Sequence, residues 1–366
     1  MARHRKASSG GSNTMMIAIG VIVILVIVAA AFMFMGGEET QTPTQQETPT
    51  QQTPAQQEQT PAQEQTPAQK EEFRIIMYTG SPGGIYNPLG KRIAEVVSKY
   101  SDTLEVVAQD SGASVANGKA IKIGDAQVAL MQSDVAYFAY NGKLIKDFDG
   151  NPVTNLRALA SLYPEPIQIV ARADAGINTI WDLEGKVVAV GNPGSGLYAT
   201  AFTILTTLGL WDNIVKQELG FKDVSQQIKQ GTVDVFFVVA GVPTPKIEQL
   251  AIQVKLNLVN VPDDAIQKLK EAGLGSLYLP YNIPAGSYEF QTEDIQTVTV
   301  MATLVASADL PDDVVYEFLK TMFERLDEIK TVHERAKDID IMNAPTTPIP
   351  LHPGAEKFYK DQGVLS

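Results

Sequence analysis

The sequence predicts an α/β protein with two lobes, and three observations lead to this prediction. First, apolar strand-like runs alternate with helix-like segments from Phe73 onward, which is typical of a mainly parallel sheet covered by helices. Second, polar or glycine-rich turns follow four of the strand-like runs. Third, two β-rich segments, 156–174 and 296–307, bracket a second alternating unit. The chain is therefore expected to cross from one lobe to the other and to return.

The N-terminal part predicts a membrane anchor. Basic residues precede the run Met15–Met35, which contains no charged residue and is 21 residues long. At ~1.5 Å per residue such a run spans roughly 30 Å, the hydrocarbon thickness of a bilayer. We expect residues 1–14 to be cytoplasmic and 15–35 to be a single transmembrane helix, with the folded part on the extracytoplasmic face of the cell membrane. A cleaved signal peptide is the alternative, but its apolar region is usually only about 7–15 residues.

Residues 36–72 are expected to form a disordered stalk rich in Thr, Pro and Gln. The segment contains no Leu, Ile, Val or aromatic residue, and the pentapeptide QTPAQ recurs at 52–56, 59–63 and 65–69. A stretch without apolar side chains cannot offset its own ordering entropy, and frequent prolines keep it extended.

The folded part divides into predicted elements by its hydrophobic pattern. Strands are expected at 73–80, 104–110, 126–134, 187–190, 233–240, 255–260 and 296–307, and helices after 81–90, after 111–114, at 135–142, at 199–208 and at 309–326. Segment 156–174 is interpreted as two short strands broken at Pro164 and Pro166. We expect lobe 1 to comprise 73–168 plus 295–366 and lobe 2 to comprise 169–294, with a hinge at the two crossings.

The turn GNPGSG at 191–196 is the most informative candidate site. It lies between the strand-like run 187–190 and a helix, so several unpaired backbone N–H groups would point at one spot that suits an anion. Leu197 and Tyr198 stand where a phosphate-binding P-loop has Lys and Ser/Thr, and the glycine spacing differs from the dinucleotide fingerprint. A plain turn with Ser195 as helix N-cap is an equal alternative.

Composition excludes several classes of function. The net charge is −13 and no basic stripe exists, which argues against nucleic acid as a partner. The absence of cysteine excludes thiol catalysis, and three scattered histidines do not suggest a zinc site. The Asp and Glu residues show no isolated pair with apolar flanks that would suggest tuned acid–base chemistry. We therefore expect no catalytic residue, no metal and no cofactor, and an enzyme on a two-lobed scaffold is the least favoured reading.

The turns after the predicted strands supply the candidate ligand-binding residues, because the carboxyl ends of parallel strands meet at one edge of a sheet. For Ser133 and Asp134, a role as helix caps is an equal alternative to ligand binding. Tyr163 is expected on a cleft wall because its side chain ends in a polar hydroxyl. The full set is Ser81, Gly83, Gly84, Tyr86, Gln132, Ser133, Asp134, Tyr163, Gly194, Ser195, Gly196 and Tyr198.

Six motifs in order give the chain a resemblance to a known family. They are GGIYNPLG (83–90), ALMQSDVAYFAYNG (129–142), LRALASLYPEPIQIVARAD (156–174), VGNPGSGLYATA (190–201), VDVFFVVAGVPTP (233–245) and IPLHPGAEKFY (349–359). From Phe73 to the end the chain resembles the solute receptors of TRAP transporters, and more narrowly the TAXI subgroup. The resemblance implies a type II periplasmic-binding-protein fold that closes on a small carboxylate such as glutamate. It also implies a sodium-coupled TRAP-type permease as the partner.

The chain departs from the family pattern at two places. Leu197 and Tyr198 stand where relatives usually have Thr and an acidic residue, and Ile85 and Asn87 replace a Thr and a Tyr of the first loop. Both changes remove a hydroxyl near the expected ligand, and the first also removes a negative charge. Two other binding roles remain as alternatives to a TRAP receptor, namely the receptor of an ATP-driven importer and a ligand-binding sensor module.

Overall fold

The computed structural model describes residues 73–82 and 84–366. The predicted cytoplasmic segment, anchor and stalk, residues 1–72, lie outside this part of the chain, and so does Gly83. Among the helices that are described, none has the length and apolar character needed to cross a bilayer.

The described residues form a mixed sheet with helices packed around it. The strands are β1 (Phe73–Tyr78), β2 (Leu104–Gln109), β3 (Val128–Gln132), β4 (Leu156–Arg172), β5 (Val187–Ala189), β6 (Val215–Gln217), β7 (Val235–Val239), β8 (Leu256–Leu258), β9 (Leu279–Ile283) and β10 (Ile295–Ser307). Their order is β2-β1-β3-β10-β4-β7-β5-β6, with β8 paired to β4 and β9 paired to β10.

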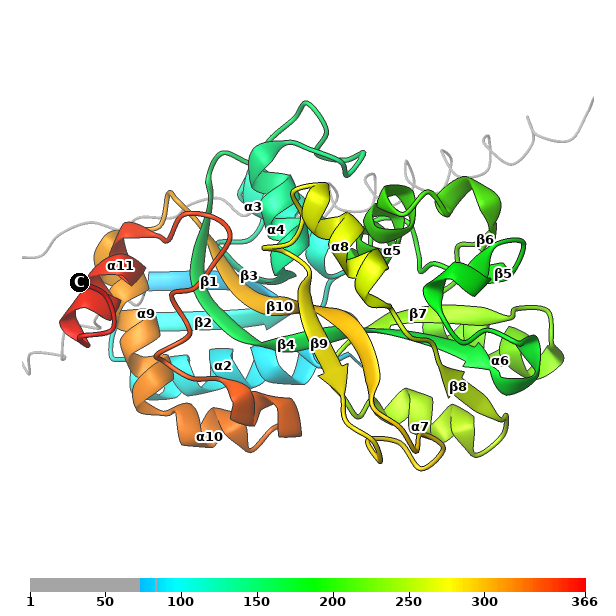
Figure 1. The fold of residues 1–366 in the computed structure, drawn as a ribbon. Helices are drawn as coiled ribbons and strands as arrows, with labels where there is room; N and C mark the ends of the chain where they lie inside the picture. The colour runs from blue at the N-terminus through cyan, green and yellow to red at the C-terminus, as the bar shows by residue number, and fades with distance from the viewer. Residues whose placement is uncertain (1–72, 83) are drawn as a thin grey trace, which may run out of the picture. The chain divides into compact units, whose positions relative to one another are not determined.

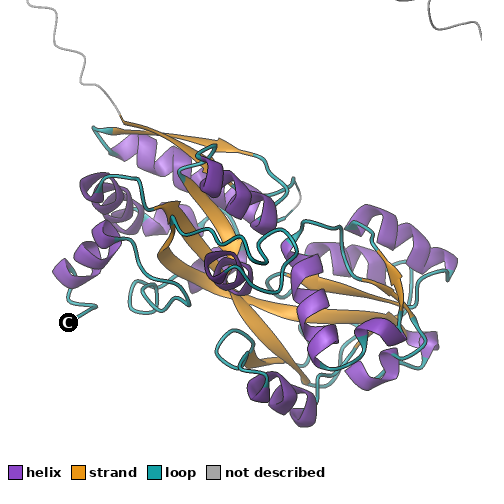
Figure 2. Ribbon diagram, turned by 90° about the horizontal axis from the view of Figure 1, so that it is seen from above, coloured by secondary structure: helices purple, strands orange, loops and turns teal. Residues whose placement is uncertain are grey.

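The helices connect these strands and continue after them. They are α2 (Tyr86–Tyr100), α3 (Ser114–Ile123), α4 (Ser133–Asn141), α5 (Gly196–Thr207), α6 (Phe221–Gln230), α7 (Pro245–Ala251), α8 (Asp263–Glu271), α9 (Asp312–Glu324), α10 (Leu326–Lys330) and α11 (Pro353–Asp361). Short 3₁₀ turns are η1 (Ala173–Ala175), η2 (Ile180–Leu183), η3 (Trp211–Asn213) and η4 (Glu334–Asp338). Figure 2 shows the helices lying on both sides of the strands.

The sheet consists of two parallel groups joined by antiparallel strands. β1 pairs in parallel with β2 and β3, and β5 pairs in parallel with β6 and β7. Every pair made by β4 or β10 is antiparallel. The prediction of a mainly parallel sheet is therefore wrong in this respect. The chain leaves the first group along β4 and returns along β10, so these neighbouring strands run in opposite directions.

β4 is one strand of 17 residues, whereas the sequence predicted two short strands. Between Leu156 and Pro166 it pairs with β10, and from Ile167 to Ala171 it pairs with β7. Pro164 and Pro166 lie before the pairing with β7 begins, where β4 has a partner strand on one side among the described residues. Because the prolines are two positions apart, their missing N–H groups fall on one edge of the strand, which tolerates proline.

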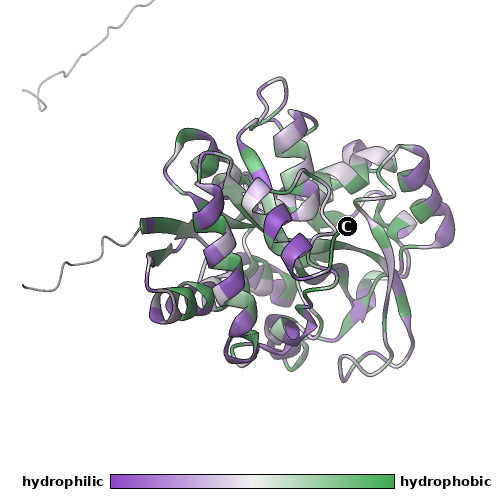
Figure 3. Ribbon diagram, turned by 90° about the vertical axis from the view of Figure 1, so that its left-hand side faces the viewer, coloured by the Kyte–Doolittle hydropathy of each residue, from purple (hydrophilic) through white to green (hydrophobic). Residues whose placement is uncertain are grey.

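We call β2, β1, β3 and the adjoining parts of β10 and β4 the first half-sheet, and the rest of β4 with β7, β5, β6 and β8 the second half-sheet. β4 and β10 cross in Figure 1 between the two groups of helices. In Figure 3 apolar segments concentrate on the strands and hydrophilic ones on the outer helices. Helix α2 follows the predicted pattern, because Leu89, Ile93, Val96 and Val97 are at most 1% exposed.

Candidate functional site

A cavity of about 220 Å³ lies where loops of the two half-sheets meet. The first half-sheet and its loops contribute eight lining residues, the second half-sheet contributes five, and Glu165 of β4 lies between them. The lining residues are Gly80, Ser81, Gly84, Ile85, Tyr86, Gly112, Ala113, Gln132, Glu165, Ser195, Gly196, Leu197, Val239 and Ala240. A second, more open hollow of about 600 Å³ shares Ser81, Gly112 and Ser195 with it.

Three helix N-termini converge on this cavity. Helix α2 begins at Tyr86, α3 begins at Ser114 directly after Ala113, and α5 begins at Gly196. Each of these helices follows a parallel strand, so the amino ends come together at the carboxyl edge of the sheet. The positive ends of three helix dipoles and their first amides make the cavity favourable for an anion.

The GNPGSG turn is both a capped helix start and a wall of the cavity. Ser195 Oγ accepts a hydrogen bond of 3.1 Å from the Tyr198 amide, as the N-cap interpretation predicted. The amides of Gly196 and Leu197 donate to no protein group within the described residues. The two readings of the turn are therefore compatible, because the cap satisfies one amide and leaves two free beside the cavity.

Ala113 has an uncommon backbone conformation for a residue with a side chain. Its φ of 66° and ψ of −152° lie in a region that is essentially restricted to glycine. Such a conformation costs about 1–3 kcal/mol and persists where the surrounding structure fixes it. Ala113 immediately precedes α3 and lines the cavity. The strained backbone therefore lies at the residue that positions the amino end of α3 beside the cavity.

Gly196 marks the closest approach of the two half-sheets at the cavity. A Cβ atom at this position would lie 1.8 Å from Gln132 Oε1 and 2.7 Å from Ser114 Oγ. Gln132 ends β3, and its side-chain amide donates a 2.8 Å hydrogen bond to Thr200 Oγ1 on α5. Only glycine allows α5 to start against Gln132 in this way.

Glu165 is the one acidic residue in the lining, and it was not among the predicted site residues. It is 4% exposed, and its Oε2 accepts a 2.6 Å hydrogen bond from the Tyr86 hydroxyl. Burial raises the pKa of Glu165 to about 8, the Tyr86 hydrogen bond opposes this rise, and the nearby Asp134 carboxylate adds to it. The sequence did contain a signal, since Glu165 is a lone acid between two prolines in an apolar strand. Glu165 was not predicted because only a pair of acids in apolar surroundings was expected to mark acid–base chemistry.

Asp134 forms a buried polar network behind the cavity. The residue is fully buried, and its Oδ2 accepts hydrogen bonds from Thr200 Oγ1 at 2.7 Å and from the Tyr278 hydroxyl at 2.9 Å. Burial raises the pKa of Asp134, and these donors oppose the rise. Through Thr200, the network joins α4 to α5.

The structure brings six of the twelve predicted site residues to the lining of the cavity. They come from the first glycine-rich turn, from the end of β3 and from the GNPGSG turn, and they are Ser81, Gly84, Tyr86, Gln132, Ser195 and Gly196. Asp134 lies behind them in the buried network, and Gly83 is outside the described residues.

The other four predicted residues have different surroundings. Ser133 Oγ accepts a 2.9 Å hydrogen bond from the β10 backbone, so it holds α4 on the sheet. Tyr163 is fully buried, and its hydroxyl has no hydrogen-bond partner among the described residues. Gly194 lines the 600 Å³ hollow rather than the cavity. The ring of Tyr198 packs edge-on against Trp211, with 5.9 Å between ring centroids.

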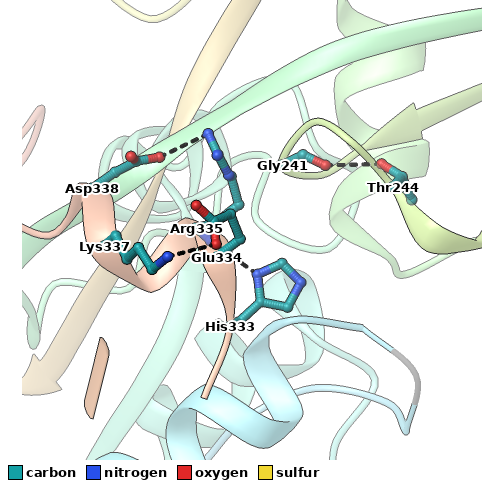
Figure 4. Close-up of polar contacts among 7 residues, drawn as sticks. All are labelled: Gly241, Thr244, His333, Glu334, Arg335, Lys337 and Asp338. Carbon is teal, nitrogen blue, oxygen red and sulfur yellow. Dashed lines mark hydrogen bonds and ion pairs between the residues drawn. The ribbon is translucent and has the colours of Figure 1, made fainter. Parts of the chain in front are cut away.

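A second contact between the two half-sheets lies next to the cavity lining at Val239 and Ala240. Figure 4 shows the η4 turn beside the loop from Gly241 to Thr244. A Cβ atom at Gly241 would lie 2.1 Å from Arg335 Cγ, so the Arg335 side chain rests on this glycine. Arg335 is held by its own turn, because its Nη1 donates a 3.1 Å hydrogen bond to Asp338.

The chain matches a known protein family. The family described as NMT1-like matches residues 77–363, which is most of the sequence. The chain belongs to the NMT1-like family. The match begins inside β1 and ends after α11, so both half-sheets of this NMT1-like protein and its cavity fall within the family region.

Several solved structures are similar to this NMT1-like chain at low identity. MatC from Rhodopseudomonas palustris with bound malate is 14% identical, with 80% of this chain and 99% of that chain covered and a TM-score of 0.49. The periplasmic aliphatic sulphonate binding protein SsuA from Escherichia coli is 16% identical, with 81% and 94% covered and a TM-score of 0.44. The GluR0 ligand-binding core from Nostoc punctiforme in complex with (L)-glutamate is 14% identical, with 72% and 99% covered and a TM-score of 0.43.

Proposed function

We propose that this NMT1-like protein is a solute receptor and not an enzyme. It captures a small carboxylate-bearing solute in the cavity and delivers it to a TRAP-type, sodium-coupled permease. The observation that carries the proposal is the convergence of three helix N-termini on one cavity, where two α5 amides have no partner among the residues that the structure describes. Amides held in this way can hydrogen-bond the carboxylate without any basic side chain.

The receptor works by closure of two lobes, 73–168 plus 295–366 and 169–294, in a type II periplasmic-binding-protein arrangement. The strand pairing supports this division, since β4 changes its partner from β10 to β7 after Pro166. A cavity lined from both sides needs an open state to admit its solute, and two strands that pass between lobes can act as a hinge.

The transport partner and the cellular location rest on the sequence. The six motifs that resemble TAXI-type receptors support a TRAP permease as the partner. The apolar run 15–35 with its basic flank supports a single-pass anchor in the cell membrane, with the receptor on the extracytoplasmic face. The stalk then tethers the receptor close to the permease.

Ligand binding is tested by thermal unfolding of the full chain with small carboxylates and with the uncharged amide of each. A solute at 100 times its Kd stabilises the folded state by about 2.7 kcal/mol, which raises Tm. We expect the acids to raise Tm and their amides to have no effect, because only the acid provides an anion for the helix N-termini. Equal shifts with acids and amides would contradict the anion site.

The transport role is tested with vesicles that contain the candidate permease and the full chain. Uptake of the bound solute should require an inward sodium gradient and should be independent of ATP. Uptake that needs ATP hydrolysis would instead identify the chain as the receptor of an ATP-driven importer.

A further inference from the structure

The charge of the cavity lining is unusual for a carboxylate site. Among the described residues that line it, Glu165 is the only charged side chain, and no lysine, arginine or histidine is present. Ile85, Leu197 and Val239 present apolar groups. The lining therefore offers an anion only helix amides and neutral donors such as the Ser81 hydroxyl, and its one charged side chain among the described residues is acidic.

Two acceptor atoms on buried side chains of the lining receive no hydrogen bond from the described residues. Glu165 is 4% exposed and Gln132 is 7% exposed, and both side chains line the cavity. The Tyr86 hydroxyl satisfies Glu165 Oε2, while no hydrogen bond reaches Glu165 Oε1 or Gln132 Oε1 within the described residues. Because both side chains line the cavity, these oxygens are placed to accept a hydrogen bond from a donor on the ligand.

We propose that the solute carries a single acid group, an apolar body and a second polar group that is a hydrogen-bond donor. This inference rests on the receptor function proposed above and specifies its substrate class. The acid group binds the amides of Gly196 and Leu197, and the apolar body packs against Ile85 and Val239. The donor, a hydroxyl or an ammonium group, bonds to Glu165.

The same geometry disfavours a dicarboxylate. Above the Glu165 pKa of about 8, a second carboxylate would meet the ionised Glu165, with Asp134 buried behind it, and would find no cation in the lining. Like charges brought together in a desolvated site cost several kcal/mol. The cavity volume also limits the size of the solute. At roughly 30 Å³ per molecule of liquid water, 220 Å³ would hold about seven water molecules.

Two matched ligand pairs test the proposal by titration calorimetry of the full chain at pH 9, where Glu165 is ionised. The pairs are leucine against glutamate, and 2-hydroxy-4-methylpentanoate against 2-hydroxyglutarate. We expect the singly acidic member of at least one pair to bind, and its dicarboxylate to bind at least about tenfold more weakly. Glu165→Gln should reduce this preference by about tenfold, whereas Glu184→Gln, which removes an exposed carboxylate elsewhere, should leave it unchanged.

The outcomes separate the substrate class from the function itself. If a dicarboxylate binds as tightly as its partner, or if the preference survives Glu165→Gln, the single-acid proposal is wrong while the receptor function stands. If no small carboxylate, from these pairs or from the wider panel, binds at millimolar concentration, the receptor function is wrong as well.

Discussion

At the scale of single residues, Glu165 makes the stability of the fold depend on pH. Its pKa rises from an ordinary value of 4.5 to about 8 on folding. Below pH 4.5 the carboxyl is protonated in both the folded and the unfolded chain, so its contribution is fully favourable. Between these values the unfolded chain ionises first, and the free energy of unfolding falls as pH rises. The total loss is at most about 5 kcal/mol, since each pKa unit corresponds to about 1.36 kcal/mol.

The measurement is urea unfolding of wild type and of Glu165→Gln from pH 5 to pH 9. We expect the variant to lose less stability than wild type as pH rises through this window, because glutamine does not ionise. Glu184→Gln serves as the control, because Glu184 is exposed. Parallel curves for wild type and Glu165→Gln would show that the pKa of Glu165 is the same in the folded and the unfolded chain.

Gly196 is expected to tolerate no side chain. Gly196→Ala should lower the free energy of unfolding by about 1–3 kcal/mol, because the added methyl group would overlap Gln132 Oε1. Gly84→Ala is the matched control, since a Cβ there would meet only the Ser81 carbonyl oxygen at 3.6 Å. Urea unfolding compares the two variants, and equal effects would mean that Gln132 can move aside.

Ala113 provides a residue-scale test of backbone strain. Ala113→Gly removes the Cβ atom from a conformation that suits glycine, so we expect the free energy of unfolding to rise by about 1 kcal/mol. Thermal and urea unfolding measure this change. A destabilised Ala113→Gly variant would indicate that the methyl group contributes more through packing than its backbone strain costs.

At the scale of elements, the contact between α4 and α5 depends on one hydroxyl group. Thr200 is fully buried, donates to Asp134 and accepts from Gln132. Thr200→Val keeps the shape but removes one of the donors to Asp134 and the acceptor of the Gln132 amide, which should cost about 1–3 kcal/mol. Thr206→Val, an exposed substitution on the same helix, should change stability by less than about 0.5 kcal/mol. If the two variants unfold alike, the network adds nothing to the packing of α5.

The elements that could be predicted from sequence are those with a local cause. The strand–turn–helix around GNPGSG is confirmed because its apolar run, its glycines and the Ser195 cap are neighbours in the chain. β4 was divided wrongly because its continuity depends on β10, which follows much later in the sequence. Glu165 was missed for the same reason, since its partner Tyr86 is 79 positions away. Side chains that meet only through the tertiary fold leave little local signal.

At the scale of the whole molecule, we expect the receptor to contract when it binds a solute. Small-angle scattering should give a smaller radius of gyration with saturating 2-hydroxy-4-methylpentanoate, or with whichever panel acid binds, than without it. Gly241→Val should reduce this contraction, because the new side chain would overlap Arg335 in the contact shown in Figure 4. An unchanged radius in the saturated wild-type protein would indicate a rigid, preformed cavity.

The return of the chain along β10 also has a consequence for biosynthesis. Ser133 and Met301 are 168 positions apart, yet the hydrogen bond between them fixes α4 against β10. The second half-sheet can pair β5, β6 and β7 as soon as those segments leave the ribosome. β3 must wait for almost the whole chain before β10 reaches it. Synthesis from the N-terminus therefore leaves the β10-facing edge of β3 unpaired for a long time. During this interval an unpaired strand edge exposes the nascent chain to aggregation.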